Sequence, residues 1–220
     1  MRKSFIVLLL VLAVVLMSFG SVSASDSVTA YVVHGIPNLP VDIYVDGVLF
    51  VADFQPGTIA GPLVGPADFF ADLVIVPTGG DPANPALSAR LGFTAGQNVT
   101  AVAHLTENGT PTLSLFENNV SPTSDARITV RHLAAAPAVD ALVFPGTADQ
   151  IRVGPLSNGD EVVTELAPGS YTAGLAPAGT DTVIFGPQSM TLESGKGYFA
   201  FAIGSLVDGT FNMLLQVIDL

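Results

Sequence analysis

From residue 25 onward the chain alternates apolar and polar positions in short runs, with no helical stripe of apolar residues. The runs are rich in Val, Ile, Thr, Phe and Tyr, and Gly, Pro, Asn or Asp interrupts them about every 8 to 12 residues. This spacing is typical of antiparallel β-sandwiches, because alternating strand and helix units need longer stretches of helical periodicity. Pro or Gly falls within nearly every window of helical length, so we expect almost no helix here.

The apolar runs predict the positions of the strands. In the first half they are expected near 28–34, 41–45, 48–53, 69–76, 86–93, 99–105 and 112–117. In the second half they are expected near 127–133, 139–144, 150–153, 161–166, 170–176, 182–192, 197–203 and 211–218. Asp46-Gly47 and Asn108-Gly109 each lie between two apolar runs. They predict two-residue hairpin turns, because Asp, Asn and Gly tolerate the positive φ that such turns require.

A His and an Asp eight positions apart recur about a hundred residues later. His34 ends an apolar run, a Pro-containing loop follows, and Asp42 stands in the next run; His132 and Asp140 repeat the arrangement. Two later segments keep a similar offset, since 208–210 falls 100 residues after 108–110, and 193–197 falls 99 residues after 94–98. Agreement at three separate places indicates that one domain has been duplicated.

The duplication predicts two domains of similar size. The segment 118–125 is polar, contains Pro122 and has no apolar periodicity, so it connects the two halves. We therefore predict a first domain at 25–119, a linker at 120–125 and a second domain at 126–220. Each half is long enough to bury a core of its own. So short a linker permits contact between the domains without requiring it.

The first 24 residues have the pattern of a secretory signal peptide. Arg2 and Lys3 precede an apolar run at 5–19, and Val22-Ser23-Ala24 has the small residues that a signal peptidase recognises. We predict cleavage after Ala24 and a secreted, extracellular or cell-surface protein. An uncleaved anchor is the alternative, although the run is shorter than the roughly 20 residues that span a membrane.

The composition restricts the chemistry. The sequence contains no Cys, which excludes disulfides, thiolate ligands and a lipid-modified cysteine at the cleavage site. Loss of Arg2 and Lys3 with the leader leaves five basic residues against 19 acidic ones, a net charge of about −14. This charge disfavours nucleic acid and anionic lipid, because each phosphate contact needs a Lys or Arg.

The frame Val32-Val33-His34, a Pro loop, and then Val41-Asp42-Ile43-Tyr44-Val45-Asp46-Gly47 resembles the family catalogued as domain of unknown function 4397. Two later elements, 166–171 and 192–198, are similar to the family's Leu-x-x-Gly-x-Tyr and Leu-x-x-Gly-x-x-Tyr strands. Copy two departs from the pattern at 143–146, and copy one departs at 68–70. The resemblance covers the mature chain as two copies. It implies Ig-like or transthyretin-like sandwiches in a secreted or surface-attached bacterial or archaeal protein, and it implies no reaction.

The residues with a chemical character are those of the repeated motif: His34, Asp42, Asp46, Gly47, His132 and Asp140. Each His and Asp could meet across adjacent strands, but catalysis would also need a nucleophile or metal, and no known catalytic or phosphate-binding motif is present. We therefore expect each His to close its Pro loop by bonding a backbone carbonyl or the paired Asp. A surface metal site, a calcium site in the loop carboxylates and a sugar-binding aromatic face are weaker alternatives.

These patterns favour a non-catalytic, secreted or cell-surface structural or interaction protein, with no catalytic residue, cofactor or metal assigned. Its expected partner is a cell-envelope or extracellular protein, with no nucleic acid and no membrane contact after cleavage. The alternative is an extracellular small-ligand or metal-binding protein that uses the His/Asp loop of each repeat. An enzyme is the third reading, and the patterns predict no oligomeric state.

Overall fold

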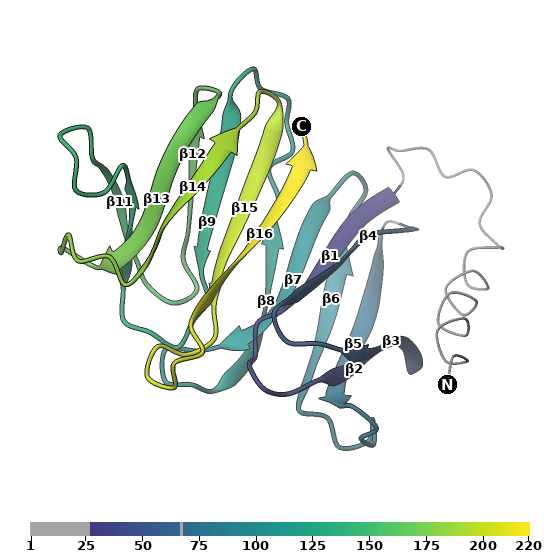
Figure 1. The fold of residues 1–220 in the computed structure, drawn as a ribbon. Helices are drawn as coiled ribbons and strands as arrows, with labels where there is room; N and C mark the ends of the chain where they lie inside the picture. The colour runs from purple at the N-terminus through teal and green to yellow at the C-terminus, as the bar shows by residue number, and fades with distance from the viewer. Residues whose placement is uncertain (1–26, 67) are drawn as a thin grey trace, which may run out of the picture.

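The computed structural model describes residues 27–66 and 68–220. These residues form sixteen strands in four four-stranded sheets and no helix, which confirms the predicted all-β fold of two β-sandwich domains (Figure 1). The predicted signal peptide and its cleavage site lie outside the described residues.

The strands of the first domain are β1 (Ser27–His34), β2 (Val41–Val45), β3 (Val48–Phe54), β4 (Thr58–Pro66), β5 (Phe69–Pro77), β6 (Leu87–Phe93), β7 (Asn98–Leu105) and β8 (Pro111–Glu117). Those of the second are β9 (Ala126–His132), β10 (Val139–Val143), β11 (Ile151–Leu156), β12 (Glu161–Leu166), β13 (Gly169–Pro177), β14 (Phe185–Leu192), β15 (Lys196–Ile203) and β16 (Asn212–Asp219).

The two domains have the same topology. The first consists of sheets β4-β1-β7-β8 and β3-β2-β5-β6, and the second of sheets β12-β9-β15-β16 and β11-β10-β13-β14. Each strand of the first domain therefore corresponds to the strand eight places later in the second. The repeat seen in the sequence is a repeat of the whole sandwich.

One strand pair in each domain departs from the antiparallel pattern. β1 pairs with β7 in parallel, and β9 pairs with β15 in parallel. Thr29 lies opposite Asn98, and Val99 lies opposite Glu117. β1 therefore begins at the same end of the sandwich at which β8 ends. The second domain repeats this arrangement, because Gly197 lies opposite both Arg127 and Ile218.

β4 was not predicted from the sequence. The strand contains Gly61, Pro62 and Pro66, which read as turn residues because Pro cannot donate a backbone hydrogen bond. β4 lies at the edge of its sheet and pairs only with β1, and an edge strand tolerates Pro on its free side.

The two predicted hairpin turns differ in outcome. Asp46 and Gly47 have φ of 49° and 77°, as a two-residue turn with positive φ at both positions requires. The prediction is wrong at 108–109, where only Gly109 has positive φ and Thr106 N donates to Thr110 O across a five-residue loop between β7 and β8.

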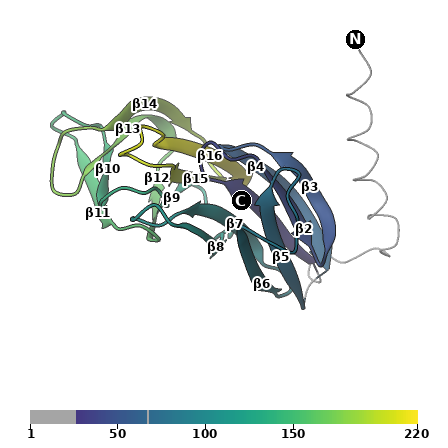
Figure 2. The same cartoon turned by 90° about the horizontal axis from the view of Figure 1, so that it is seen from below.

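Each sandwich has a hydrophobic core of its own, and a further cluster of buried apolar residues lies between the two domains. Val32, Ile43 and Ile75 belong to the core of the first sandwich, while Val139 and Leu175 belong to that of the second. A further cluster joins sheet β4-β1-β7-β8 to sheet β12-β9-β15-β16, and its buried members are Val33, Val102, Leu133, Phe199, Phe201 and Ile203. Figures 1 and 2 show these two sheets side by side. The domains therefore pack against each other, and β7 is buried along nearly its whole length because both of its faces are covered.

Candidate functional site

His34 and His132 lie at the end of the first strand of their domains, and both side chains are almost fully buried. The Nε2 atom of His34 lies 2.7 Å from the carbonyl oxygen of Leu39, and that of His132 lies 3.0 Å from Pro137 O. A carbonyl only accepts, so Nε2–H donates in each ring. Each His thus closes a five-residue span of its Pro-containing loop.

The remaining ring nitrogen of each His has no protein partner. Nδ1 of His34 and Nδ1 of His132 are buried and make no hydrogen bond within the described part of the chain. Burial lowers the pKa of both rings below the ordinary value for His, and it outweighs the loop carbonyls, which favour the charged form. Both rings are therefore neutral at pH 7, and Nδ1 presents an unused lone pair.

Asp42 and Asp140 do not meet the histidines. Val41 and Ile43 belong to the core, so Asp42 between them points to the opposite face of its sheet, away from the core where His34 stacks on Phe54. The Asp42 carboxylate accepts from Asp53 N and Gly79 N, both at 2.8 Å. The hypothesis that His and Asp form a pair across adjacent strands is therefore wrong.

The carboxylate of Asp140 has the equivalent position in the second domain. It accepts from Gly179 N at 2.7 Å and also pairs with Arg152. In both domains the Asp thus connects the second strand to the loop that follows the fifth. Asp46 has a similar local role, since its Oδ1 accepts from Asp72 N at 2.9 Å and holds the Asp46-Gly47 turn against β5.

The loop closed by each His packs against the other domain. Gly204 N of the second domain donates to Gly35 O at 3.2 Å, and a Cβ at Gly35 would come within 2.8 Å of the Ile203 side chain. On the other side, Ala135 of the second domain belongs to the core cluster of the first. The two His-closed loops, 35–40 and 133–138, are therefore contact surfaces between the domains.

Two further contacts fix this arrangement. The side-chain amide of Asn158 donates to Leu105 O at 2.9 Å and to Ala134 O at 2.7 Å, so it connects β7 to the second loop. His104 lies in the same region, with Nδ1 3.0 Å from Leu105 O and Nε2 2.9 Å from the Ser114 hydroxyl. Burial lowers the pKa of His104, and the nearby His132 lowers it further. His104 was not predicted as a site residue, although it is the one ionisable residue in a run of apolar residues.

Arg131 is the main polar residue between the sheets that face each other. Its guanidinium is fully buried and donates to Glu161 Oε2 at 2.9 Å, to Asn118 Oδ1 at 3.0 Å and to Glu117 O at 3.3 Å. It also lies 4.6 Å from the centre of the Phe116 ring, within the range of a cation–π contact. Glu117, Asn118 and Phe116 belong to the first domain, so Arg131 joins the two. The only signal in the sequence is an Arg within an apolar strand.

Every Lys and Arg in the described part of the chain is paired with a carboxylate: Arg90, Arg127, Arg131, Arg152 and Lys196. The same part holds no group of three or more His, Cys, Asp or Glu residues able to coordinate a metal ion. A cleft of about 220 Å³ lies between the His34 loop and the end of β15, with Asn38, Thr210 and Asn212 among its lining residues. No charged side chain lines it.

The sequence profile of the domain of unknown function DUF4397 matches residues 28–142, which is 115 of the 220 residues. The chain belongs to this family. The DUF4397 match begins in β1 and ends in β10, so it includes His34 and Asp42 as well as His132 and Asp140.

Other comparisons add little to the DUF4397 assignment. No curated protein matches the chain. A crystal structure from Bacteroides uniformis, described as a candidate cell adhesion protein, aligns with 90% of this chain and 99% of its own at 12% identity and a TM-score of 0.31. Within residues 27–66 and 68–220, no helix is long and apolar enough to cross a membrane.

Proposed function

We propose that this DUF4397 protein is a non-catalytic, secreted or cell-surface structural or interaction protein whose two sandwiches act as one rigid unit. The observation that carries the proposal is that the four His and Asp residues of the repeated motif make structural hydrogen bonds. His34 and His132 close the loops that pack between the domains, and Asp42 and Asp140 connect strands to loops. The His and Asp side chains that could have formed a reactive site thus stabilise the fold.

The distribution of charge supports a location outside the cell. The protein is strongly acidic, and its few cations are already paired within the described residues. An acidic, cation-poor surface keeps a protein soluble and limits contact with phosphate-bearing molecules. The apolar leader with Val22-Ser23-Ala24 supplies an export signal.

We further infer that residues 126–220 form a second copy of the DUF4397 domain and that both copies are Ig-like or transthyretin-like sandwiches. The strand-for-strand correspondence of the two domains supports this, as does the matching use of His34 and His132. On this proposal the first copy comprises the strands between 27 and 117 and the second those between 126 and 219, with the linker between them.

Protease treatment of intact source cells tests the location. The full chain, expressed with its own leader, should begin at Ser25 by mass spectrometry and should be in the medium or accessible to added protease before lysis. A chain that keeps Met1, or that resists protease until the cells are broken, would contradict the proposal.

The alternative, a metal- or small-ligand-binding protein, has one observation in its favour: the unpartnered Nδ1 of His34 and His132. A thermal shift series with zinc and calcium separates the two readings, because a ligand that binds only the folded protein raises its melting temperature. A shift that disappears in His34→Ala or His132→Ala would favour the alternative. No shift with either ion would favour the structural role.

A further inference from the structure

The cleft of about 220 Å³ lies where the two domains meet, and residues of both domains line it. The first domain contributes residues of the loop closed by His34 and the turn at 56–57, and the second contributes residues between 203 and 212. Gly204 N donates to Gly35 O at 3.2 Å and thereby joins the two walls. The cleft is therefore continuous with the interface between the domains.

Pro56, beside the cleft, takes the place that Asn158 has in the second domain. The residue after each, Gly57 or Gly159, donates its backbone N–H to the carbonyl of the motif His of its domain at 2.7 Å. Both glycines have positive φ, of 72° and 96°. The backbones of the two turns thus match at this point, and the two positions can be compared directly.

The presence of Pro56 instead of Asn leaves an acceptor at the cleft without a donor. In the second domain the Asn158 amide donates to Leu105 O at 2.9 Å and to Ala134 O at 2.7 Å. Pro has neither a side-chain donor nor a backbone N–H, so Pro56 cannot make such bonds. Ile36 corresponds to Ala134, because each lies two residues after the motif His. Ile36 lines the cleft, and its carbonyl accepts no hydrogen bond within the described residues.

The polar side chains of the cleft that are free to bind a ligand are two uncharged amides. Asn38 is exposed, and its side chain makes no hydrogen bond in the part of the chain that the structure describes. Asn212 is also exposed, and only its Oδ1 is used, which accepts from Met213 N at 2.8 Å. The Thr210 hydroxyl is already bonded to the backbone of Ser205. Pro and Ile side chains supply the apolar part of the lining.

A peptide main chain matches these groups. Its N–H can donate to Ile36 O, as the Asn158 amide donates at the corresponding place, and its C=O can accept from the amide of Asn38 or Asn212. No charged side chain lines the cleft to hold an ion, and no aromatic ring offers a sugar a face to stack on. The volume lies below the range of about 300–1,000 Å³ of larger ligand sites, so a short extended segment fits.

The loop that borders the cleft also carries exposed apolar side chains. Leu206 and Val207 are 38% and 92% exposed, and they lie in the loop between β15 and β16, whose two ends line the cleft. The corresponding loop of the first domain, between β7 and β8, carries Glu107 and Asn108. Beside the cleft, a partner would therefore find apolar surface to cover.

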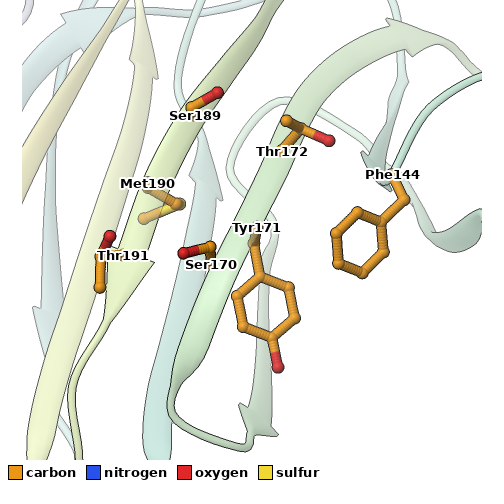
Figure 3. A pocket seen from close by; sticks show the side chains of 7 residues that line it. All are labelled: Phe144, Ser170, Tyr171, Thr172, Ser189, Met190 and Thr191. Atoms are coloured by element: carbon orange, nitrogen blue, oxygen red, sulfur yellow. The ribbon is translucent and has the colours of Figure 1, made fainter.

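The hollow of about 250 Å³ in Figure 3 has a less suitable lining. Ser170, Thr172 and Ser189 lie on one face of sheet β11-β10-β13-β14, whereas Tyr171 and Met190 lie on the other face and pack on the core of the second domain. One ligand cannot contact both sets of side chains.

We propose that the cleft between the domains binds a short, uncharged, extended segment of a partner polypeptide. The main chain of the segment bonds Ile36 O and the amides of Asn38 and Asn212, and its apolar side chains contact Val207. The inference rests on the proposed function only in that it names the kind of partner such an interaction protein takes. Binding by the purified protein does not depend on where the protein is located, so failure of this test leaves the test of location intact.

The test is an NMR titration of the isotope-labelled protein with three capped neutral hexapeptides, which alternate Ser with Val, Thr with Ala, and Gly with Leu. We expect at least one to bind with a dissociation constant of about 0.1–1 mM, with the largest shifts at the backbone amides of Asn38, Gly57 and Gly204. No binding by any of the three at millimolar concentration, or largest shifts elsewhere, would overturn the proposal.

A fully N-methylated form of the best peptide tests the main-chain bonds. It has no N–H to donate to Ile36 O, so it should bind at least about tenfold more weakly than the unmodified peptide. Equal binding by the two forms would contradict the proposed recognition of the main chain.

Variants locate the site. Pro56→Asn introduces the residue that bridges the domains at the corresponding turn, so it should occupy the cleft and weaken binding at least about tenfold. Val207→Ser shortens an exposed side chain, and it should keep the melting temperature and weaken binding about threefold. The matched control is Val48→Ser, at the far end of β3 from Pro56, which should change binding less than about twofold. Full binding by both Pro56→Asn and Val207→Ser would refute the site.

Discussion

At the scale of single residues, the described part of the chain buries three neutral histidines, and two of them hold loops in place. A buried donor or acceptor that loses its partner keeps the full cost of its removal from water. Leu39 O and Pro137 O would be left in that state without His34 and His132. The contribution of each histidine to stability is therefore larger where water cannot reach the carbonyl and take the place of the ring N–H.

The first prediction concerns His34. The change His34→Ala should lower the free energy of unfolding by about 1–3 kcal/mol, because it leaves Leu39 O without its donor and removes the ring stacked on Phe54. Urea unfolding measures this. His34→Gln, which keeps an N–H donor, should recover part of the loss. An unchanged midpoint for His34→Ala would show that the loop does not depend on the imidazole.

The second prediction concerns pH. Burial lowers the pKa of His34, His104 and His132 in the folded protein, while the unfolded chain takes up protons at the ordinary value near 6.5. The unfolded state then binds more protons as the pH falls below 6.5, so stability is full above that value and declines below it. The melting temperature should fall between pH 7 and pH 5.

Replacement of one His identifies the source of this pH effect. His104→Leu should make the fall in melting temperature between pH 7 and pH 5 shallower, because one proton-binding group is removed from the unfolded chain. An equally steep fall in His104→Leu and in the unmodified protein would mean that other groups cause the effect.

The sequence predicted the place of the motif residues better than their partners. The recurrence of His34 and Asp42 as His132 and Asp140 was evident from spacing alone. The spacing of two residues in the sequence does not determine whether their side chains, on different strands, face each other. Asp42 therefore accepts hydrogen bonds from the backbone of β3 and of the loop after β5, whereas His34 lies on the core-facing side of the other sheet.

At the scale of elements, a single carboxylate joins strands to loops. Asp42 on β2 accepts from Asp53 at the end of β3 and from Gly79 beyond the end of β5. Hydrogen bonds to a charged acceptor are stronger than those between neutral groups. The position of the segment 78–86 is therefore fixed partly by a residue nearly forty positions earlier.

The third prediction follows from this carboxylate. Asp42→Asn should keep the bond from Asp53 N and lose the charged acceptor for Gly79 N, at a cost of about 1.5–3 kcal/mol. Hydrogen exchange of the Gly79 amide should become faster than in the unmodified protein. Asp208→Asn, in an exposed turn, is the matched control and should change neither quantity. Unchanged exchange at Gly79 in Asp42→Asn would refute this role.

Alternation of apolar and polar residues predicted the strands that have one covered face. It failed for β4, where Gly and Pro in an edge strand imitate a turn. The segments 99–105 and 197–203 lack this alternation, as strands covered on both faces do, but nothing in the sequence shows that the second cover comes from the other domain. The periodicity of apolar residues indicates which faces of a strand are buried, but it does not show which element covers them.

At the scale of the whole molecule, the two sandwiches share a core. Phe199 and Phe201 of the second domain belong to the same buried cluster as Val33 and Val102 of the first. Arg131 adds polar contacts to Glu117 and Asn118 across the same interface. Units coupled in this way should unfold together, whereas domains joined only by a flexible linker would unfold separately.

The fourth prediction is a single unfolding transition in scanning calorimetry. Arg131→Ala should lower stability by about 3 kcal/mol, because it empties a fully buried site and leaves Asn118 Oδ1 without that donor. It should also broaden or split the transition as the domains uncouple. Arg90→Ala removes an exposed cation and should have little effect. Two transitions in the unmodified protein would contradict the coupling.

The parallel pairing of β1 with β7 places the start of the first domain and the end of its last strand at one end of the molecule, and the His-closed loops at the other. Ser27 and Leu220 both lie at the end where the linker passes from one domain to the other, as the ends of β1 and β16 in Figure 1 indicate. The His-closed loops lie at the opposite end. Fluorophores attached near residues 27 and 220 should therefore show strong energy transfer in the folded state. A molecule tethered to a support through residue 27 or residue 220 would stand upright, with both loops directed away from the support.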